Sequence, residues 1–306
     1  MKFTALLLLL GLAALAAASD DIDWSKVRPI SRMPRYWRRI PKELMRQMTL
    51  ELKDLPRHRP EGRIVGGYVA TPGQFPYQVA LVSQFPEGGA LCGGSVLSAN
   101  FILTAAHCVD QASGGTVILG AQDRTDAAEA GQVRIPFVQS GIYYHQEWTP
   151  ELIRNDIATV RMQSPVTFSD RIQPVTLPTW SDVENDFSGI TGTVSGFGRF
   201  SDDIPEASNI LRYVDNPIQT NTACNIRFLG LIQPENICLS GDNGRGACSG
   251  DSGGPLTISR GGDTVQVGVV SFGLALGCER NWPSAFARTT SFLQWIQAHS
   301  DVIIQA

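Results

Sequence analysis

Three short segments carry side chains that can perform nucleophilic chemistry together. Ser252 lies in the glycine-rich run CSGDSGGP, where glycine lets a ligand approach the backbone closely. A serine hydroxyl is a weak nucleophile unless a base takes its proton, and the run TAAHC offers His107 beside a cysteine. An imidazole base needs an orienting carboxylate, and Asp156 precedes apolar residues that predict partial burial. The three segments therefore predict a serine nucleophile activated by a histidine and an aspartate.

In this order, the histidine, aspartate and serine segments resemble the chymotrypsin family of serine endopeptidases, from Ile64 to about Ile303. Two further runs are similar to family segments: IVGG at Ile64, typical of the N-terminus that zymogen cleavage creates, and SFG at Ser271, similar to a substrate-binding strand. Five such segments in the right order rarely arise by chance. The resemblance implies an all-β fold of two antiparallel Greek-key β-barrels with a C-terminal helix.

The resemblance also implies a role for each residue. Ser252 would attack the scissile carbonyl, His107 would take and return the proton, and Asp156 would hold the required tautomer. The backbone N–H groups of Gly250 and Ser252 would form an oxyanion hole, worth about 3 kcal/mol per donor in the transition state. The alternative, a glycine-rich turn with only a structural role, leaves the matching His107 and Asp156 segments unexplained.

The composition indicates an ordinary secreted globular protein. The 306 residues are 43% hydrophobic and 18% charged with a net charge of -4, which excludes a typical nucleic-acid-binding protein. The apolar run Thr4 to Leu15 follows Lys2 and is shorter than the roughly 20 residues that span a bilayer. With the alanines at 16–18 it predicts a signal peptide over residues 1–18, a secreted and extracellular protein, and no membrane partner.

Charge divides the rest of the chain at Arg63. Residues 19–63 hold twelve basic and seven acidic residues, a net charge of +5. The chain from Ile64 onward holds 12 arginines, no lysine and 22 acidic residues, a net charge of -10. We therefore predict a basic propeptide over 19–63 and a peptidase domain over 64–306. By resemblance, a trypsin-like protease cleaves after Arg63 and the new amine of Ile64 pairs with Asp251.

The propeptide is expected to be a solvated segment that cannot build a core alone. It carries five prolines, so at most a short helix around Lys42 to Leu52 is expected. A weaker alternative is that the basic, aromatic stretch from Arg35 to Arg39 contacts anionic surfaces.

Six cysteines in a secreted chain favour three disulfides over metal ligation, and their spacing alone leaves 15 pairings open. The resemblance implies Cys92 with Cys108, Cys224 with Cys238, and Cys248 with Cys278. No cysteine precedes Cys92, so a disulfide cannot tether the propeptide. We expect no cofactor and no required metal, because Ala121 stands where the family carries its first calcium-binding glutamate.

By resemblance, Gly246 lies at the base of the primary pocket, Gly273 and Ser284 form its walls, and Ser271 and Phe272 belong to the substrate-binding strand. Such a pocket favours a large apolar or aromatic side chain before the scissile bond. The pattern is similar to arthropod chymotrypsins and brachyurin-type collagenases. Some of these accept basic residues through an aspartate at the position of Ser284. Glu279 is expected on the surface, so no preference for Arg or Lys is predicted.

Alternation of β-prone residues between turn residues predicts an all-β domain with a single terminal helix. The expected strands are Tyr77–Val82, Thr116–Leu119, Val133–Val138, Thr191–Val194 and Val265–Phe272, and the expected helix is Phe292–Ile303.

The leading hypothesis is a digestive endopeptidase zymogen. The alternatives are a regulatory protease of extracellular fluid and, from another class, a non-catalytic homologue that acts as a binding module. The implied partners are protein or peptide substrates, an activating trypsin-like protease and protein protease inhibitors, and the domain is expected to be a monomer. Because arginine stays protonated at higher pH than lysine, a domain whose cations are all arginine suits an alkaline gut lumen.

Overall fold

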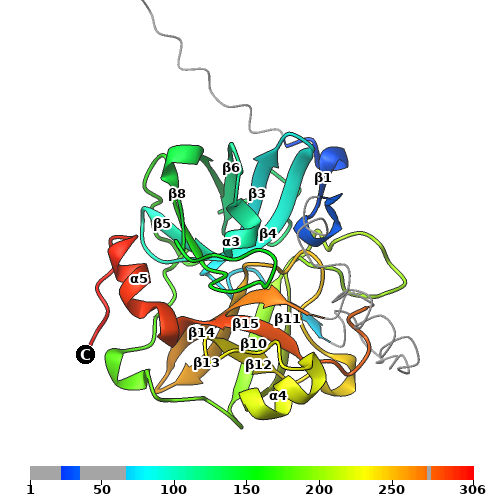
Figure 1. Ribbon diagram of the computed structural model, residues 1–306. Helices are drawn as coiled ribbons and strands as arrows, with labels where there is room; N and C mark the ends of the chain where they lie inside the picture. The colour runs from blue at the N-terminus through cyan, green and yellow to red at the C-terminus, as the bar shows by residue number, and fades with distance from the viewer. Residues whose placement is uncertain (1–21, 35–66, 274–276) are drawn as a thin grey trace, which may run out of the picture.

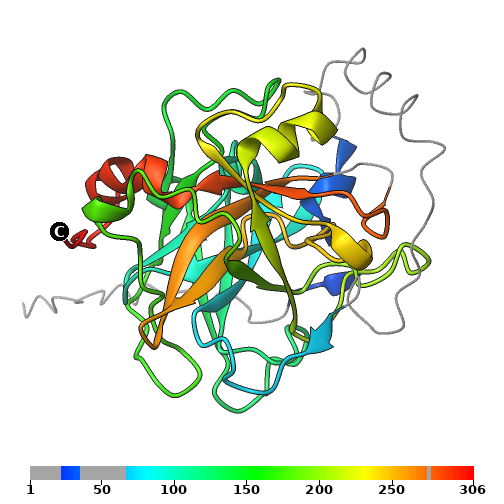
Figure 2. The same ribbon diagram turned by 90° about the horizontal axis from the view of Figure 1, so that it is seen from below.

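The computed structural model describes residues 22–34, 67–273 and 277–306. Two β-sheets form two lobes, one above the other in Figure 1. The view from below in Figure 2 shows the longer helices at the outside of these lobes. The expected all-β, chymotrypsin-like architecture is confirmed. The predicted helix around Lys42 to Leu52 lies outside the described residues.

The first sheet curls into a half-barrel with the strand order β7-β6-β3-β4-β5-β9-β8, all antiparallel. Its strands are β3 (Gln78–Phe85), β4 (Gly88–Val96), β5 (Phe101–Thr104), β6 (Gly114–Leu119), β7 (Val133–Val138), β8 (Ile142–Tyr144) and β9 (Ala158–Arg161). The β3–β4 hairpin runs from the pair Gln78 and Ser95 to the pair Phe85 and Gly88.

The second sheet closes into a six-stranded barrel, because β10 pairs with both β13 and β11. Its strands are β10 (Thr191–Gly196), β11 (Arg212–Gln219), β12 (Asn236–Leu239), β13 (Pro255–Arg260), β14 (Asp263–Phe272) and β15 (Ser284–Arg288), with the short β2 (Tyr68–Val69) on the edge of β11. A bulge near Val267 shifts the alternation of β14, so that Val265 packs in the core of the second sheet and Val269 in the core of the first. The strand β14 therefore joins the two lobes.

All five predicted strands are present, and β7 has the predicted bounds. The described helices are α3 (Ala106–Val109), α4 (Asn221–Phe228) and α5 (Leu293–Ala298), with 3-10 turns η1 (Trp24–Lys26), η2 (Ile30–Arg32), η3 (Gln139–Gly141), η4 (Trp180–Asp182), η5 (Asp242–Gly244) and η6 (Thr289–Phe292). The predicted helix at the C-terminus is shorter than expected, since α5 ends at Ala298. Its Trp295 and Ile296 pack in the core of the first sheet.

Residues 22–34 contact the first sheet, so the expectation of a solvated leader is wrong for this part. The strand β1 (Val27–Pro29) pairs in parallel with β4, beside which Figure 1 shows it. Ile30 and Met33 are 1% and 3% exposed and belong to the core of the first sheet. The edge of β4 offers unpaired backbone groups, and a short strand ending in proline can pair there although it cannot extend the sheet further.

Three disulfides hold the loops, joining Cys92 to Cys108, Cys224 to Cys238, and Cys248 to Cys278. These are the pairs that the resemblance implies, and such bonds persist in an extracellular, oxidising environment. In the part of the chain that the structure describes, no helix is long and apolar enough to cross a membrane.

Candidate active site

His107 and Asp156 come together from two neighbouring strands of the first sheet, β5 and β9. β5 ends at Thr104, and the single-turn helix α3 that follows carries His107. Asp156 precedes β9 and follows Asn155, whose φ of 54° is a left-handed conformation that asparagine tolerates. This turn directs Asp156 inward, and the predicted burial is found, with 2% of Asp156 exposed.

The carboxylate of Asp156 is held by three donors. Its Oδ2 lies 2.7 Å from Nδ1 of His107 and accepts the hydroxyl of Ser271 at 2.5 Å. Its Oδ1 accepts the backbone N–H of His107 at 2.9 Å. A carboxylate fixed at both oxygens holds the ring in one orientation, with Nδ1 toward Asp156 and Nε2 away from it.

Ser252 lies on a turn of the second sheet that contacts the first sheet closely. The carbonyl of Ser252 accepts the backbone N–H of Gly93 in β4 at 2.7 Å. A Cβ atom on Gly253, whose φ is +80°, would lie 2.2 Å from the hydroxyl oxygen of Thr104. Only glycine fits this contact, because the turn packs directly on the strand that leads to His107. Ser252 and His107 are each 7% exposed.

Asp251, the residue before Ser252, is a fully buried carboxylate. Its Oδ1 accepts the N–H of Gly198 at 2.7 Å, and its Oδ2 accepts the N–H of Cys248 at 2.9 Å. Burial raises the pKa of Asp251 to about 6, although these two hydrogen bonds lower it. Among the described residues Asp251 has no ion-pair partner. Arg63 and Ile64 lie outside the described residues, so their predicted roles remain predictions.

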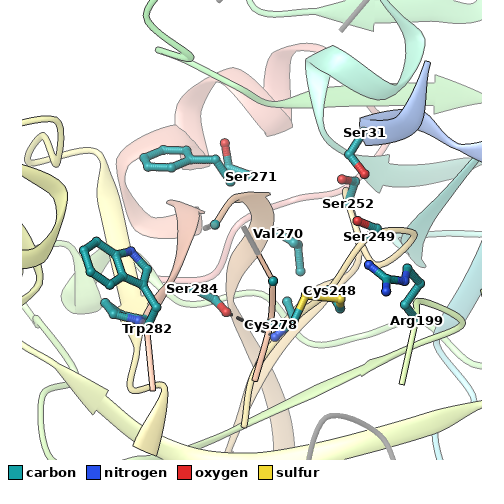
Figure 3. A pocket seen from close by; sticks show the side chains of 15 residues that line it. Ser31, Arg199, Cys248, Ser249, Ser252, Val270, Ser271, Cys278, Trp282 and Ser284 are labelled. Carbon is teal, nitrogen blue, oxygen red and sulfur yellow. Dashed lines mark hydrogen bonds between the residues drawn. A yellow bond between two sulfur atoms is a disulfide. The ribbon is translucent and has the colours of Figure 1, made fainter. Parts of the chain in front are cut away.

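A cleft of about 100 Å³ opens beside Ser252. Figure 3 shows Ser271, Val270 and Ser284 on strands β14 and β15, with the Cys248–Cys278 disulfide below Ser252. The hydroxyl of Ser284 accepts the N–H of Ala247 at 3.1 Å. Phe272 and Gly273, predicted to bind substrate, also line the cleft. Gly246 does not, but its Cβ position lies 2.8 Å from the hydroxyl of Ser284, directly behind the lining.

Several residues of the cleft were not predicted from the sequence, among them Trp282 and Arg199. Trp282 contributes an aromatic wall that packs edge-on against Phe228 with 5.8 Å between the ring centroids. Arg199 lies at the opposite end, and its guanidinium donates to the carbonyls of Ser201, Asp202 and Ile204. Neither stands in a motif, and Arg199 was one cation among twelve in the domain.

Glu279 is buried, which corrects the expectation that it lies on the surface. Its carboxylate accepts the N–H of Asp202 at 3.2 Å, and the carboxylate of Asp202 accepts the N–H groups of Cys278 and Glu279. The two carboxylates thus fasten the loop after Ser201 to the disulfide at the rim of the cleft. Glu279 is not among the residues that line the cleft.

The segment that follows Ala121, where the family carries its calcium site, is held by its own hydrogen bonds. The carboxylate of Glu129 accepts the N–H groups of Gln122 and Asp123 at 2.8–3.0 Å and pairs with the guanidinium of Arg171. A cation would have to displace these donors. In the described residues, the clusters with metal-like spacing each contain cysteines that are disulfide-bonded and unsuited to ligation.

Known proteins are similar to most of this chain. The family model described as Trypsin matches residues 64–296. The chain is 41% identical over 240 residues to brachyurin of Leptuca pugilator, covering 78% of this chain and 99% of that protein. It is 39% identical over 246 residues to chymotrypsin of Phaedon cochleariae, covering 80% and 85%. The solved structure of HL collagenase superposes with a TM-score of 0.71 at 34% identity, covering 79% of this chain and all of that one.

Proposed function

The chain belongs to the trypsin family of serine proteases, and from this premise we propose a zymogen whose catalytic residues are Ser252, His107 and Asp156. The observation that carries the proposal is the fixed His107–Asp156 pair, 2.7 Å apart, beside a serine in a glycine-rich turn. A non-catalytic binding module is disfavoured, since the chain keeps all three residues.

In the proposed mechanism Ser252 attacks the scissile carbonyl and passes its proton to Nε2 of His107. Asp156 keeps the ring proton on Nδ1 and stabilises the imidazolium that forms. The tetrahedral oxyanion is assigned to the N–H groups of Gly250 and Ser252. His107 returns its proton to the leaving amine, and water then releases the acyl group by the same steps in reverse order.

We assign activation to cleavage after Arg63. The support is the buried carboxylate of Asp251, which has a raised pKa and no cation among the described residues. An ammonium group at Ile64 would neutralise that charge and so favour the conformation in which it is buried. The activating protease is proposed to be trypsin-like, because the bond follows an arginine.

The cleft supports a preference for large apolar or aromatic residues before the scissile bond. Trp282, Val270 and Phe272 offer apolar surface, and Ser284 contributes only a neutral hydroxyl to the lining. Burial of an aromatic side chain there is worth on the order of 2 to 3 kcal/mol. No carboxylate lines the cleft among the described residues, which argues against a preference for lysine or arginine.

We propose a digestive role in an alkaline gut lumen, with protein substrates and protein inhibitors as partners and the monomer as the working form. Two of the relatives are named chymotrypsin and collagenase, which are names of enzymes that cut proteins. The second candidate is a regulatory protease of extracellular fluid, and expression confined to tissues other than the gut would favour it.

The test is hydrolysis of short nitroanilide substrates that differ in the residue before the scissile bond, namely Phe, Leu, Ala and Arg. The full chain is assayed before and after cleavage by trypsin, with the Ser252→Ala variant treated identically to account for residual trypsin. We expect hydrolysis only after cleavage, fastest with Phe or Leu and absent in Ser252→Ala. No hydrolysis of any substrate would exclude the enzyme, and hydrolysis after Arg alone would exclude the proposed pocket.

A further inference from the structure

The described part of the leader lies along β4, the strand whose Gly93 contacts Ser252. β1 runs parallel to β4, pairing Val27 with Gly89 and Pro29 with Leu91. Two residues beyond Leu91, Gly93 donates its N–H to the carbonyl of Ser252. Because the two strands run in the same direction, the chain that leaves β1 travels toward the nucleophile.

The turn η2 brings the leader to the cleft itself. Ser31 lines the same cleft as Ser252, and Figure 3 shows the two serines next to each other. The next residue, Arg32, lies near Arg199, whose pKa is lowered by burial and then by the positive charge of Arg32. The leader therefore occupies space directly beside the candidate nucleophile.

Side-chain contacts anchor the segment on both sides of β1. After the strand, Ile30 and Met33 are buried in the core of the first sheet. Before it, the ring of Trp24 lies under the guanidinium of Arg124, 4.4 Å from the ring centroid. Burying two large apolar side chains lowers a dissociation constant by on the order of 10³-fold.

Among the described leader residues, only Ser31 lines the cleft. Cys92, Cys108 and the residues of β4 do not line it, although Sγ of Cys108 lies 3.4 Å from the carbonyl of Ser252. The disulfide and β4 therefore lie next to Ser252 but outside the cleft. A substrate whose side chain enters the cleft must continue past Ser252 over that disulfide and the edge of β4. This is the edge that β1 occupies.

We propose that residues 22–34 are a built-in inhibitor that blocks the half of the site where the substrate continues after the scissile bond. The proposal rests on the proposed protease function. In this proposal the segment also stays bound, without a covalent link, after the chain is cut at Arg63.

Two features favour retention after cleavage. The 29 residues between Pro34 and Ile64 can span up to about 100 Å, so a cut at Arg63 does not require the docked segment to move. The propeptide over 19–63 carries +5 and the peptidase domain -10, so the two fragments attract each other. Full activity against long substrates then needs a second event, either dissociation of the leader or its digestion.

The first experiment measures retention without catalysis. In the full-length Ser252→Ala chain, the last few residues of the leader, which end at Arg63, are replaced by the recognition sequence of a protease that cuts nowhere else. Residues 22–34 are kept. The cleaved protein is then passed through a size-exclusion column at low salt. We expect the leader to co-elute with the domain, and Ile30→Asp to weaken its affinity about 30-fold. The matched control is Arg28→Gln, a change at an exposed position of β1. A leader that elutes alone would overturn the proposal.

The second experiment uses the same cleavage site in the chain that retains Ser252. Substrates are a short nitroanilide and an eight-residue peptide with four residues after the scissile bond. In Ile30→Asp and in Met33→Asp we expect hydrolysis of the long peptide to rise about tenfold or more, with less than threefold change for the nitroanilide. Equal rates in wild type and variants, or equal gains for both substrates, would refute the assignment. Absence of hydrolysis in every form would instead exclude the protease function. The co-elution in the first experiment does not depend on catalysis and would still show whether the leader stays bound to the domain.

Discussion

The buried carboxylate of Asp251 gives the uncleaved chain a defined dependence of stability on pH. Unfolding returns this group to water, where its pKa is 3.8, whereas burial in the folded chain raises the pKa to about 6. The perturbation that isolates this group is Asp251→Asn, which keeps its shape and removes its titration.

The difference between the two pKa values sets the size and the sign of the effect. Below about pH 4 the carboxyl is protonated in both states and costs nothing. Between pH 4 and 6 the folded state binds more protons than the unfolded state, so the free energy of unfolding falls as the pH rises. Above pH 6 the full cost of about 3 kcal/mol is present.

The assay is denaturant unfolding of the full, uncleaved chain in the Ser252→Ala background at several values between pH 4 and 8. The altered hydrogen bonds of the asparagine variant change its free energy of unfolding by an amount that does not depend on pH. The informative quantity is therefore the change with pH of the difference between the two proteins. Relative to Asp251→Asn, the parent chain should lose about 3 kcal/mol between pH 4 and 7.

Cleavage after Arg63 supplies the second comparison. If the ammonium group of Ile64 pairs with Asp251, the pKa of the carboxyl falls and the loss of stability between pH 4 and 7 disappears from the cleaved form. A parallel pH profile for the parent and Asp251→Asn in the uncleaved chain would refute the argument from burial. An unchanged profile after cleavage would refute the proposed pairing.

Three further predictions concern the site and its supports. Asp156→Asn should lower kcat about 10⁴-fold with little change in KM, measured on a short nitroanilide, because the wrong histidine tautomer is favoured; a loss confined to KM would contradict the assigned role. Ser284→Asp should create hydrolysis after Arg and Lys and weaken hydrolysis after Phe, measured as the ratio of kcat/KM values, and an unchanged ratio would place Ser284 outside the pocket. Addition of a chelator should leave the Tm unchanged because Glu129 is already bound by N–H donors, whereas Arg171→Met should lower stability by about 1 to 3 kcal/mol; a drop in Tm with the chelator would reveal a metal.

The strands that could be predicted are those in which the pattern of apolar residues along the sequence agrees with the pattern of burial in the fold. β7 reads Val-Arg-Ile-Pro-Phe-Val, and its buried Ile135 and Phe137 alternate with less buried residues as a half-buried strand requires. β4 escaped prediction because four of its nine residues are glycines, which are poor strand formers. It is nevertheless a central strand, between β3 and β5, and a Cβ atom on its Gly93 would lie 2.8 Å from the backbone of Gly254, next to the turn of Ser252.

The site residues divide in a similar way. Those carried by runs of unusual composition, such as Ser252 and His107, could be named from the sequence. The position of Glu279 could not, because its burial depends on the N–H of Asp202, a residue 77 positions away. The contact of the leader was missed for a related reason. The prolines and positive charge of the leader predicted a solvated segment, because they carry no information about the open edge of β4 with which Val27–Pro29 pairs.

The division of the site between the two sheets has a consequence for the chain when it is cut in half. The first sheet supplies His107 and Asp156 and the second supplies Ser252, the proposed nucleophile. One backbone hydrogen bond, from Gly93 to Ser252, joins the two sheets at this serine. Two fragments separated in the connection between β9 and β10 would each be inert. Substrate hydrolysis would be restored only when the two fragments reassociate in the native arrangement. The rate of hydrolysis would then report the association of two separate polypeptides.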